Sequence, residues 1–133
     1  MHLATKLRQR LAHEESGFTL IELLVVLVII GILLAIAVPS YLGFKDRANE
    51  KAAKANIRAA LPAAEAYYSD NGTYVGMTTA GLQSIDSGVS STVKVTGTPT
   101  ATSYTICSKV GNKLFQVTGP GADDSDYVVA SAC

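Results

Sequence analysis

The hydrophobic pattern divides the chain into one uniformly apolar run and a longer region in which polar and apolar positions are mixed. From Phe18 to Val38 there are twenty-one residues, all apolar or small except Thr19 and Glu22. As a helix with a rise of about 1.5 Å per residue, this run spans the roughly 30 Å hydrocarbon core of a bilayer. Because it is apolar on every side, it must be surrounded by lipid or by other apolar helices. We therefore expect residues 18–39 to form a membrane-spanning helix.

From Ser40 the pattern changes to that of an amphipathic helix rich in alanine. Its apolar stripe, which can cover a sheet, consists of Ala53, Ile57, Ala60 or Leu61, Ala64 and Tyr68. Pro62 should bend the helix one turn earlier. The sequence Asp70-Asn71-Gly72 should end it, since Asn and Gly tolerate the left-handed conformation. One long helix is therefore predicted from Phe18 to about Ser69.

Short segments rich in Val, Ile, Thr and Tyr follow and predict β-strands. They are Thr92 to Thr96, Ser103 to Val110, Leu114 to Thr118 and Tyr127 to Ala130. Gly111 and Asn112 between two of them predict a tight hairpin turn. Residues 75–91 are small and polar and predict a loop. Three or four antiparallel strands against the distal half of the helix give an α+β fold.

Glu22 is a carboxylate within the apolar run. Inserting such a charged group into a membrane costs on the order of 3 kcal/mol of free energy. We therefore expect Glu22 to have a function and a partner for its charge. The alternative is a side chain near one end of the span that reaches the headgroups. A basic stretch with Lys6, Arg8 and Arg10 precedes a Gly-Phe junction at residues 17 and 18, and Glu22 is the fifth residue after that junction.

This stretch resembles the type IV pilin family, whose precursors carry a short basic leader, the junction Gly-Phe-Thr-Leu-Ile-Glu and a long apolar helix. The match is residue for residue over Gly17 to Glu22 and continues to Pro39. The resemblance implies cleavage between Gly17 and Phe18 by a prepilin peptidase, methylation of the new Phe18 amino group, and assembly into a fibre. It also implies that Glu22 pairs with the amino-terminal charge of a neighbouring subunit.

Gly31 and Pro39 are the helix-weakening positions of the span. They stand where the family has its own glycine and proline, and packed fibres of the family tend to unwind between them. A gentle kink of a membrane helix is the alternative. The domains expected are a leader over 1–17, a polymerisation helix over 18–39, and a globular head over 40–133 that includes the distal half of the helix.

The positive leader favours the cytoplasmic side, which places the carboxyl-terminal part outside the membrane. An ordinary secretory signal peptide is the alternative, because Ala35-Ile36-Ala37 resembles its cleavage site. The apolar run is longer than is usual for such a signal and contains a glutamate. We therefore expect a single-pass precursor in the cytoplasmic membrane, and then an extracellular filament.

The two cysteines, Cys107 and Cys133, lie in the half of the chain that is delivered across the membrane, where disulfides persist. The head is small and buries little hydrophobic core. A disulfide between the two cysteines would stabilise it by roughly 3.5 kcal/mol. Two free buried thiols are the alternative. Two cysteines with no histidine cluster do not make a zinc site. The resemblance adds that pilin heads commonly close their carboxyl-terminal region with such a disulfide.

Composition argues against catalysis. Both histidines, His2 and His13, lie in the expected leader, and the chain has no phosphate loop, nucleophile elbow or paired-histidine motif. We expect no enzyme, no cofactor and no metal site. The acidic run Asp123 to Asp126 could hold calcium, as a comparable loop does in major pseudopilins. It lacks the spacing of an EF-hand, however, and the alternative is a solvated acidic turn. A net charge of zero indicates no nucleic-acid partner.

The function expected is that of a structural subunit that forms a homopolymer, with the prepilin peptidase and the inner-membrane pilus assembly machinery as partners. One alternative is a pseudopilin of a type II secretion or DNA-uptake machine, because Tyr67 to Tyr74 resembles a turn found in both groups. Another is a monomeric membrane-anchored binding module. Adhesion, motility and DNA uptake stay open, as does glycosylation at Asn71.

Charge is distributed unevenly along the head. Residues 40–58 carry a balance of plus three and residues 59–133 a balance of minus three. In a fibre, one surface of a subunit meets a different surface of the next. We therefore hypothesise that the loop at Asp123 to Asp126 packs near the basic helix segment of a neighbour, around Lys51 and Lys54, and sets the register.

Overall fold

The computed structural model describes residues 5–6 and 17–133. Most of the predicted leader over residues 1–17, including His2 and His13, therefore lies outside the described residues. The chain forms two compact units, one up to Leu42 and one from Gly43 to Cys133.

Helix α2 runs from Leu20 to Asn71 and confirms the single long helix predicted from sequence. Gly72 ends it in the left-handed conformation, with φ of +69°. The Gly72 amide donates to the Tyr68 carbonyl at 2.7 Å, which satisfies one of the free carbonyls of the last turn. The predicted turn at Asp70 to Gly72 is therefore a helix cap.

Gly31, Pro39 and Pro62 all lie inside α2 and do not interrupt it. A helix break between Gly31 and Pro39 is thus not present in the single chain. The unwinding that the family resemblance implies concerns subunits packed in a fibre, and it stays a prediction.

The loop predicted over residues 75–91 is wrong in part, because helix α3 runs from Thr79 to Ile85. Thr78 caps it, its hydroxyl accepting a hydrogen bond from the Gly81 amide at 3.1 Å. Leu82 is fully buried in the core and holds the short helix in place. One core side chain and one cap are too weak a pattern to predict a helix of this length.

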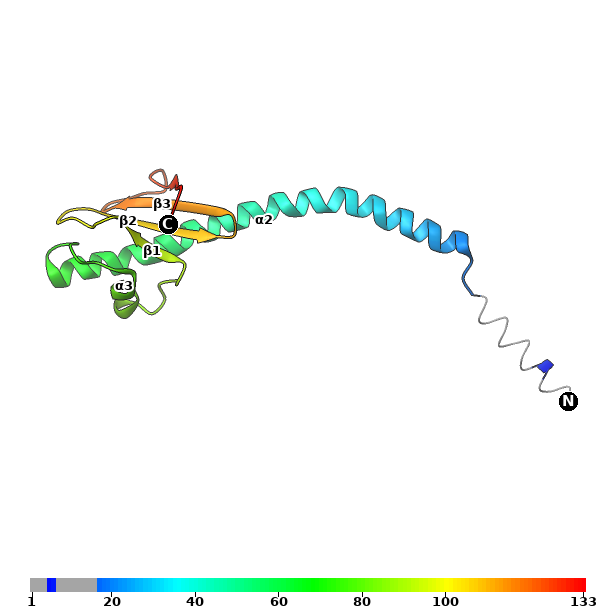
Figure 1. The fold of residues 1–133 in the computed structure, drawn as a ribbon, viewed down its shortest axis with the longest axis horizontal. Helices are drawn as coiled ribbons and strands as arrows, with labels where there is room; N and C mark the ends of the chain where they lie inside the picture. Colours follow the sequence, from blue (N-terminus) through cyan, green and yellow to red (C-terminus); the bar gives the residue numbers. More distant parts are fainter. Residues whose placement is uncertain (1–4, 7–16) are drawn as a thin grey trace. The chain divides into compact units, whose positions relative to one another are not determined.

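Four strands form one antiparallel sheet in the order β1-β2-β3-β4 (Figure 1). Their bounds are β1 Val93–Thr96, β2 Tyr104–Val110, β3 Lys113–Gly119 and β4 Val128–Val129. Val110 pairs with Lys113, so Gly111 and Asn112 form the predicted two-residue hairpin. Gly111 has φ of +59°, as the first position of a type II′ turn requires. The α+β fold is confirmed.

The core of the head lies between the sheet and the part of α2 that follows Gly43. Figure 1 shows β1, β2 and β3 lying along this part of the helix. Fully buried helix side chains such as Ala53, Ile57 and Ala64 belong to one cluster with Ile106 of β2 and Val117 of β3. The predicted apolar stripe is therefore core from Ala53 to Ala64, and its alanines let the sheet approach the helix closely, whereas its last member, Tyr68, is exposed.

Cys107 and Cys133 form the predicted disulfide, with their Cα atoms 5.8 Å apart. Cys107 alternates along β2 with the core residue Ile106, so its side chain faces the other side of the sheet. The Ala130 amide donates to the Leu114 carbonyl at 3.1 Å. The last residues must therefore cross β3 on the outer face of the sheet, where the bridge fixes them to β2.

Candidate functional site

The part of α2 up to Leu42 presents apolar side chains in every direction. The large apolar side chains from Leu20 to Val38 keep between 46% of their surface exposed, at Ile30, and 87%, at Leu20. The helix is long and apolar enough to cross a membrane. None of the residues that the structure describes covers this segment, so it requires lipid or other apolar helices around it.

Thr19 and Glu22 form a reciprocal cap at the start of α2. The Thr19 amide donates to the Glu22 carboxylate at 2.9 Å, and the Glu22 amide donates to the Thr19 hydroxyl at 3.3 Å. This is a capping box, which satisfies two amides that have no partner within the helix. The signal for it, threonine followed three residues later by glutamate, is visible in the sequence, but our sequence interpretation assigned Glu22 only to assembly.

Gly17 and Phe18 precede the helix and are exposed. Phe18 keeps 82% of its surface accessible. The bond between them is therefore accessible, as cleavage by a peptidase requires. Cleavage at this bond and methylation of Phe18 remain predictions.

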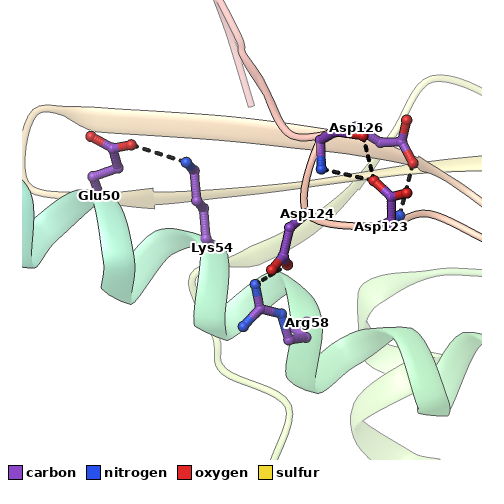
Figure 2. A network of polar contacts seen from close by, with 7 residues as sticks. Glu50, Lys54, Arg58, Asp123, Asp124 and Asp126 are labelled. Carbon is purple, nitrogen blue, oxygen red and sulfur yellow. Dashed lines mark hydrogen bonds and ion pairs between the residues drawn. The ribbon is translucent and has the colours of Figure 1, made fainter.

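The acidic loop, residues 123–126, is held by its own hydrogen bonds (Figure 2). The Asp123 carboxylate accepts a hydrogen bond from the Ser125 amide at 2.8 Å and a second one from the Ser125 hydroxyl. These hydrogen bonds hold the pKa of Asp123 below its usual value. The Asp126 carboxylate in turn accepts from the Asp123 amide at 2.8 Å. The loop is therefore a structured turn.

Arg58 of α2 pairs with the third carboxylate of the loop, Asp124, within the same chain. Its guanidinium also lies 5.9 Å from the centre of the Tyr127 ring, a cation–π distance. Both partners of the ion pair are largely exposed, so it contributes about 0.2 to 1 kcal/mol at most. The acidic loop and the basic part of α2 therefore meet within one subunit through Arg58 and Asp124. The predicted contact of the loop with the helix of a neighbour, around Lys51 and Lys54, stays a prediction.

Lys54 is also engaged within its own chain. Its ammonium donates to the Glu50 carboxylate at 2.9 Å, one helical turn away, and lies 4.7 Å from the centre of the Phe115 ring. The hydrogen bond and the charge of Lys54 lower the pKa of Glu50. The predicted role of Lys54 in a contact with a neighbour is therefore not supported.

The calcium hypothesis for residues 123–126 is not supported either. In the part of the chain that the structure describes, no three carboxylate, imidazole or thiol side chains come together as metal ligands. The three carboxylates of the loop turn to three different partners, as Figure 2 shows.

A second polar site, which the sequence did not reveal, lies near the end of α2. The Tyr74 hydroxyl is 3.1 Å from both carboxylate oxygens of Glu65, and the Tyr104 hydroxyl is 3.4 Å from one of them. The Tyr74 ring lies 4.8 Å from the Tyr68 ring and 4.7 Å from the Tyr104 ring. We call Glu65, Tyr68, Tyr74 and Tyr104 the tyrosine–glutamate cluster.

Burial, reinforced by the hydrogen bond to Glu65, raises the pKa of Tyr74 to about 12. Burial and the Glu65 charge raise the pKa of Tyr104 as well. The two hydroxyls therefore stay protonated and act as donors to the carboxylate throughout the physiological range. Tyr104 comes from a strand and Tyr74 from a loop, so no spacing in the sequence could have predicted the cluster.

Residues 13–38 match the family model described as the prokaryotic N-terminal methylation motif. The chain is 35% identical over 106 residues to the type IV wide pilus major component PilA4 of Thermus thermophilus, an alignment that covers 80% of this chain and 74% of the relative. The chain belongs to the type IV pilin family. The region of the methylation motif includes the junction, Glu22 and the whole apolar run from Phe18 to Val38.

Other relatives match over a shorter part of this pilin. It is 45% identical over 61 residues to the type IV major pilin protein PilA of Myxococcus xanthus, which covers 46% of this chain and 28% of the relative. It is 46% identical over 61 residues to the type II secretion system core protein G of Pseudomonas aeruginosa, covering 46% of this chain and 43% of that relative. The matched segment thus spans less than half of either relative.

Proposed function

We propose that this pilin is the structural subunit of a type IV pilus or a pilus-like filament. The observation that carries the proposal is the uncovered apolar half of α2 with a single carboxylate near its start. A helix of this kind is stable in a membrane and, once extracted, only among other apolar helices. Polymerisation through it supplies that environment. The proposed role is therefore structural.

The processing and location follow the family. The precursor stays in the cytoplasmic membrane with the head outside, a prepilin peptidase cleaves between Gly17 and Phe18, and the new Phe18 amino group is methylated. The inner-membrane assembly machinery then adds subunits to an extracellular fibre. In the fibre, the Glu22 carboxylate pairs with the Phe18 amino group of a neighbour, which neutralises both charges inside the apolar bundle.

Two observations favour a pilus over the pseudopilus of a secretion machine. The relative aligned over 80% of this chain and 74% of its own length is named as a pilus component, whereas the type II secretion system core protein G of Escherichia coli aligns over 57% and 52%. The carboxylates of the acidic loop are engaged by Arg58 and by the loop itself, which leaves them poorly arranged for the calcium expected in a major pseudopilin.

Two measurements test the proposal. Mass spectrometry of the mature protein should give a chain that begins at Phe18 and carries one additional methyl group. Negative-stain microscopy of material sheared from cells, with an antibody against this chain, should show long labelled filaments. A mature chain beginning at Val38 would indicate a secretory signal, and an intact Met1 a permanent anchor. Labelled chain without filaments would indicate a monomeric binding module.

A further inference from the structure

The tyrosine–glutamate cluster borders an open pocket on the head. The pocket has a volume of about 350 Å³ and is lined by Glu65, Tyr68, Tyr74, Thr102 and Pro120. Tyr74 is buried to 2% exposure and orients the Glu65 carboxylate, whereas Tyr68 keeps 40% of its surface exposed. The carboxylate is therefore held at the surface beside an accessible aromatic ring.

The chemistry of this pocket selects a cation on an apolar stem. Both donors to Glu65 are neutral hydroxyls, so its negative charge is not compensated, and within the described residues it makes no ion pair. Aromatic faces attract ammonium and guanidinium groups and pack against the methylene stems of Lys and Arg. The fitting ligand is a lysine or arginine side chain.

The same chain carries a surface of the opposite kind. A groove of about 400 Å³ is lined by Phe44, Arg47, Ala48 and Lys51. These residues recur at helical spacing on the side of α2 opposite to the core residues Ala53 and Ile57. Phe44 keeps 70% of its surface exposed.

The cations of this groove are available for a partner. Of the basic residues between Lys45 and Arg58, Lys54 and Arg58 pair with acids of their own chain. Arg47 and Lys51 are exposed and, among the residues that the structure describes, form no ion pair. An exposed aromatic ring beside two cations complements an exposed aromatic ring beside one carboxylate.

The Glu65 carboxylate and the basic groove cannot meet within one chain, because Glu65 and the groove residues lie on the same continuous helix. Lys51 and Arg47 precede Glu65 by 14 and 18 residues, which corresponds to roughly 20 to 27 Å along the axis. In a second copy that is displaced along the helix by that length and also rotated about the helix axis, the basic groove can lie level with the pocket and face it. Such a contact is heterologous and leaves a free pocket and a free groove at the two ends, so it can repeat without closing.

We propose that the Glu65 pocket takes the Lys51 or Arg47 side chain of a second copy of this chain and thereby sets the stagger between subunits. This inference rests on the proposed function, since it assigns the contact to the filament. The pair is exposed, so the apolar helices supply most of the cohesion and the pair supplies orientation.

Carbodiimide cross-linking of sheared filaments tests the contact directly, because it joins a carboxylate to an amine only where the two touch. The expected product is a peptide pair that joins Glu65 to Lys51, or to position 47 in the Arg47→Lys variant. No bond within one chain can span this separation. Glu65→Gln should abolish the product while keeping an acceptor for the tyrosine hydroxyls. Lys51→Arg should abolish the Lys51 product while leaving filaments intact.

Charge reversal in the groove tests whether the contact matters for filament assembly. The double variant Arg47→Glu and Lys51→Glu changes only exposed side chains and should reduce filament yield about two- to fivefold at low salt. The matched control is Lys94→Glu with Lys109→Glu, which changes the net charge equally on exposed strand positions and should leave the yield unchanged.

Each outcome decides the inference. Filaments in which Glu65 joins neither position 51 nor position 47 overturn the pairing alone, as does an adduct of Glu65 with another protein. Equal losses in the reversal and in its matched control also overturn it, because they would report net charge. A wild type without filaments and without any interchain product overturns the proposed function together with the pairing.

Discussion

Thr19 and Glu22 cap each other at the start of α2, with hydrogen bonds of 2.9 Å and 3.3 Å between the side chain of each and the amide of the other. Glu22 therefore has a local role in helix capping in addition to the role in assembly that the pilin family implies. Glu22→Ala would remove both roles at once. Separating them needs variants that keep one and remove the other.

Glu22→Gln keeps the capping box, since glutamine also serves at this position, and removes the charge. If Glu22 pairs with a Phe18 amino group in an apolar bundle, this variant leaves an uncompensated charge, which costs roughly 3 to 5 kcal/mol. We expect a processed, membrane-held chain with few or no filaments. Microscopy of sheared material and mass spectrometry of the membrane fraction measure the two parts of this result.

Thr19→Ala is the converse variant, because it removes the cap hydroxyl and keeps the charge. Loss of such a cap costs about 1 kcal/mol. We expect filaments in reduced but measurable number, and near wild-type number in Thr19→Ser. If Glu22→Gln forms normal filaments, the assignment of the Glu22 charge to assembly is wrong.

The Cys107–Cys133 bridge closes the end of the chain onto the outer face of the sheet. In the chain-entropy model, the loop that the bridge closes stabilises the folded head by about 3.5 kcal/mol, and breaking the bridge loses this stability. Reduction should therefore lower the melting temperature of the head by roughly 10 °C or more. Circular dichroism of the full chain in detergent, with and without reductant, measures this shift. The double variant Cys107→Ala and Cys133→Ala should have a melting temperature as low as that of the reduced wild type, and reductant should not change it. A wild type whose melting temperature does not respond to reductant would contradict the prediction.

Acid should destabilise the acidic loop through Asp123. Hydrogen bonds from Ser125 lower the pKa of Asp123 in the folded chain, so in the interval between the folded and unfolded pKa values the unfolded state binds more protons. The stability from this group is therefore present above the unfolded pKa and is lost as the pH falls through the folded pKa.

Asp123→Asn keeps an oxygen acceptor for Ser125 but does not titrate. We expect the melting temperature of the wild type to fall further between pH 7 and pH 3 than that of the variant. Asp86→Asn removes another head carboxylate and serves as the matched control. Identical acid dependence in the wild type and Asp123→Asn would show that Ser125 does not stabilise the carboxylate.

High pH should destabilise the head by ionising the tyrosines of the tyrosine–glutamate cluster. The pKa of Tyr74 is raised to about 12, so the folded state keeps a proton that the unfolded state loses above its ordinary value near 10. Stability from Tyr74 is present below that ordinary value and is lost as the pH rises towards 12. Of the six tyrosines in the chain, Tyr74 and Tyr104 should ionise late in an ultraviolet absorbance titration.

Tyr74→Phe should remove one late-ionising group and weaken the alkaline loss of stability. Tyr41→Phe, which changes an exposed tyrosine on the membrane-proximal part of the helix, should leave the late ionisation unchanged. A titration in which all six tyrosines ionise together would show that Glu65 and burial do not hold the two hydroxyls protonated.

Much of the fold could be predicted from local signals. The helix, the strands and the hairpin at Gly111 each depend on residues close in sequence. Helix α3 was missed because its evidence is a single cap at Thr78 and one core residue, Leu82, whose burial depends on distant strands. The position of the disulfide was predictable because only two cysteines exist, whereas the face of the sheet that it covers was not.

The sequence by itself determined the features that depend on composition and on short spacing: an apolar helix with no internal partner, a carboxylate near its start, and a small α+β head. Tertiary structure alone decided which charges pair across elements, whereas the Glu50–Lys54 pair follows from helical spacing. Arg58 and Asp124 are 66 positions apart, and the residues that orient Glu65 come from a loop and a strand. Pairing of this kind depends on how the sheet packs on the helix, and that packing brings together residues whose separation along the chain carries no signal.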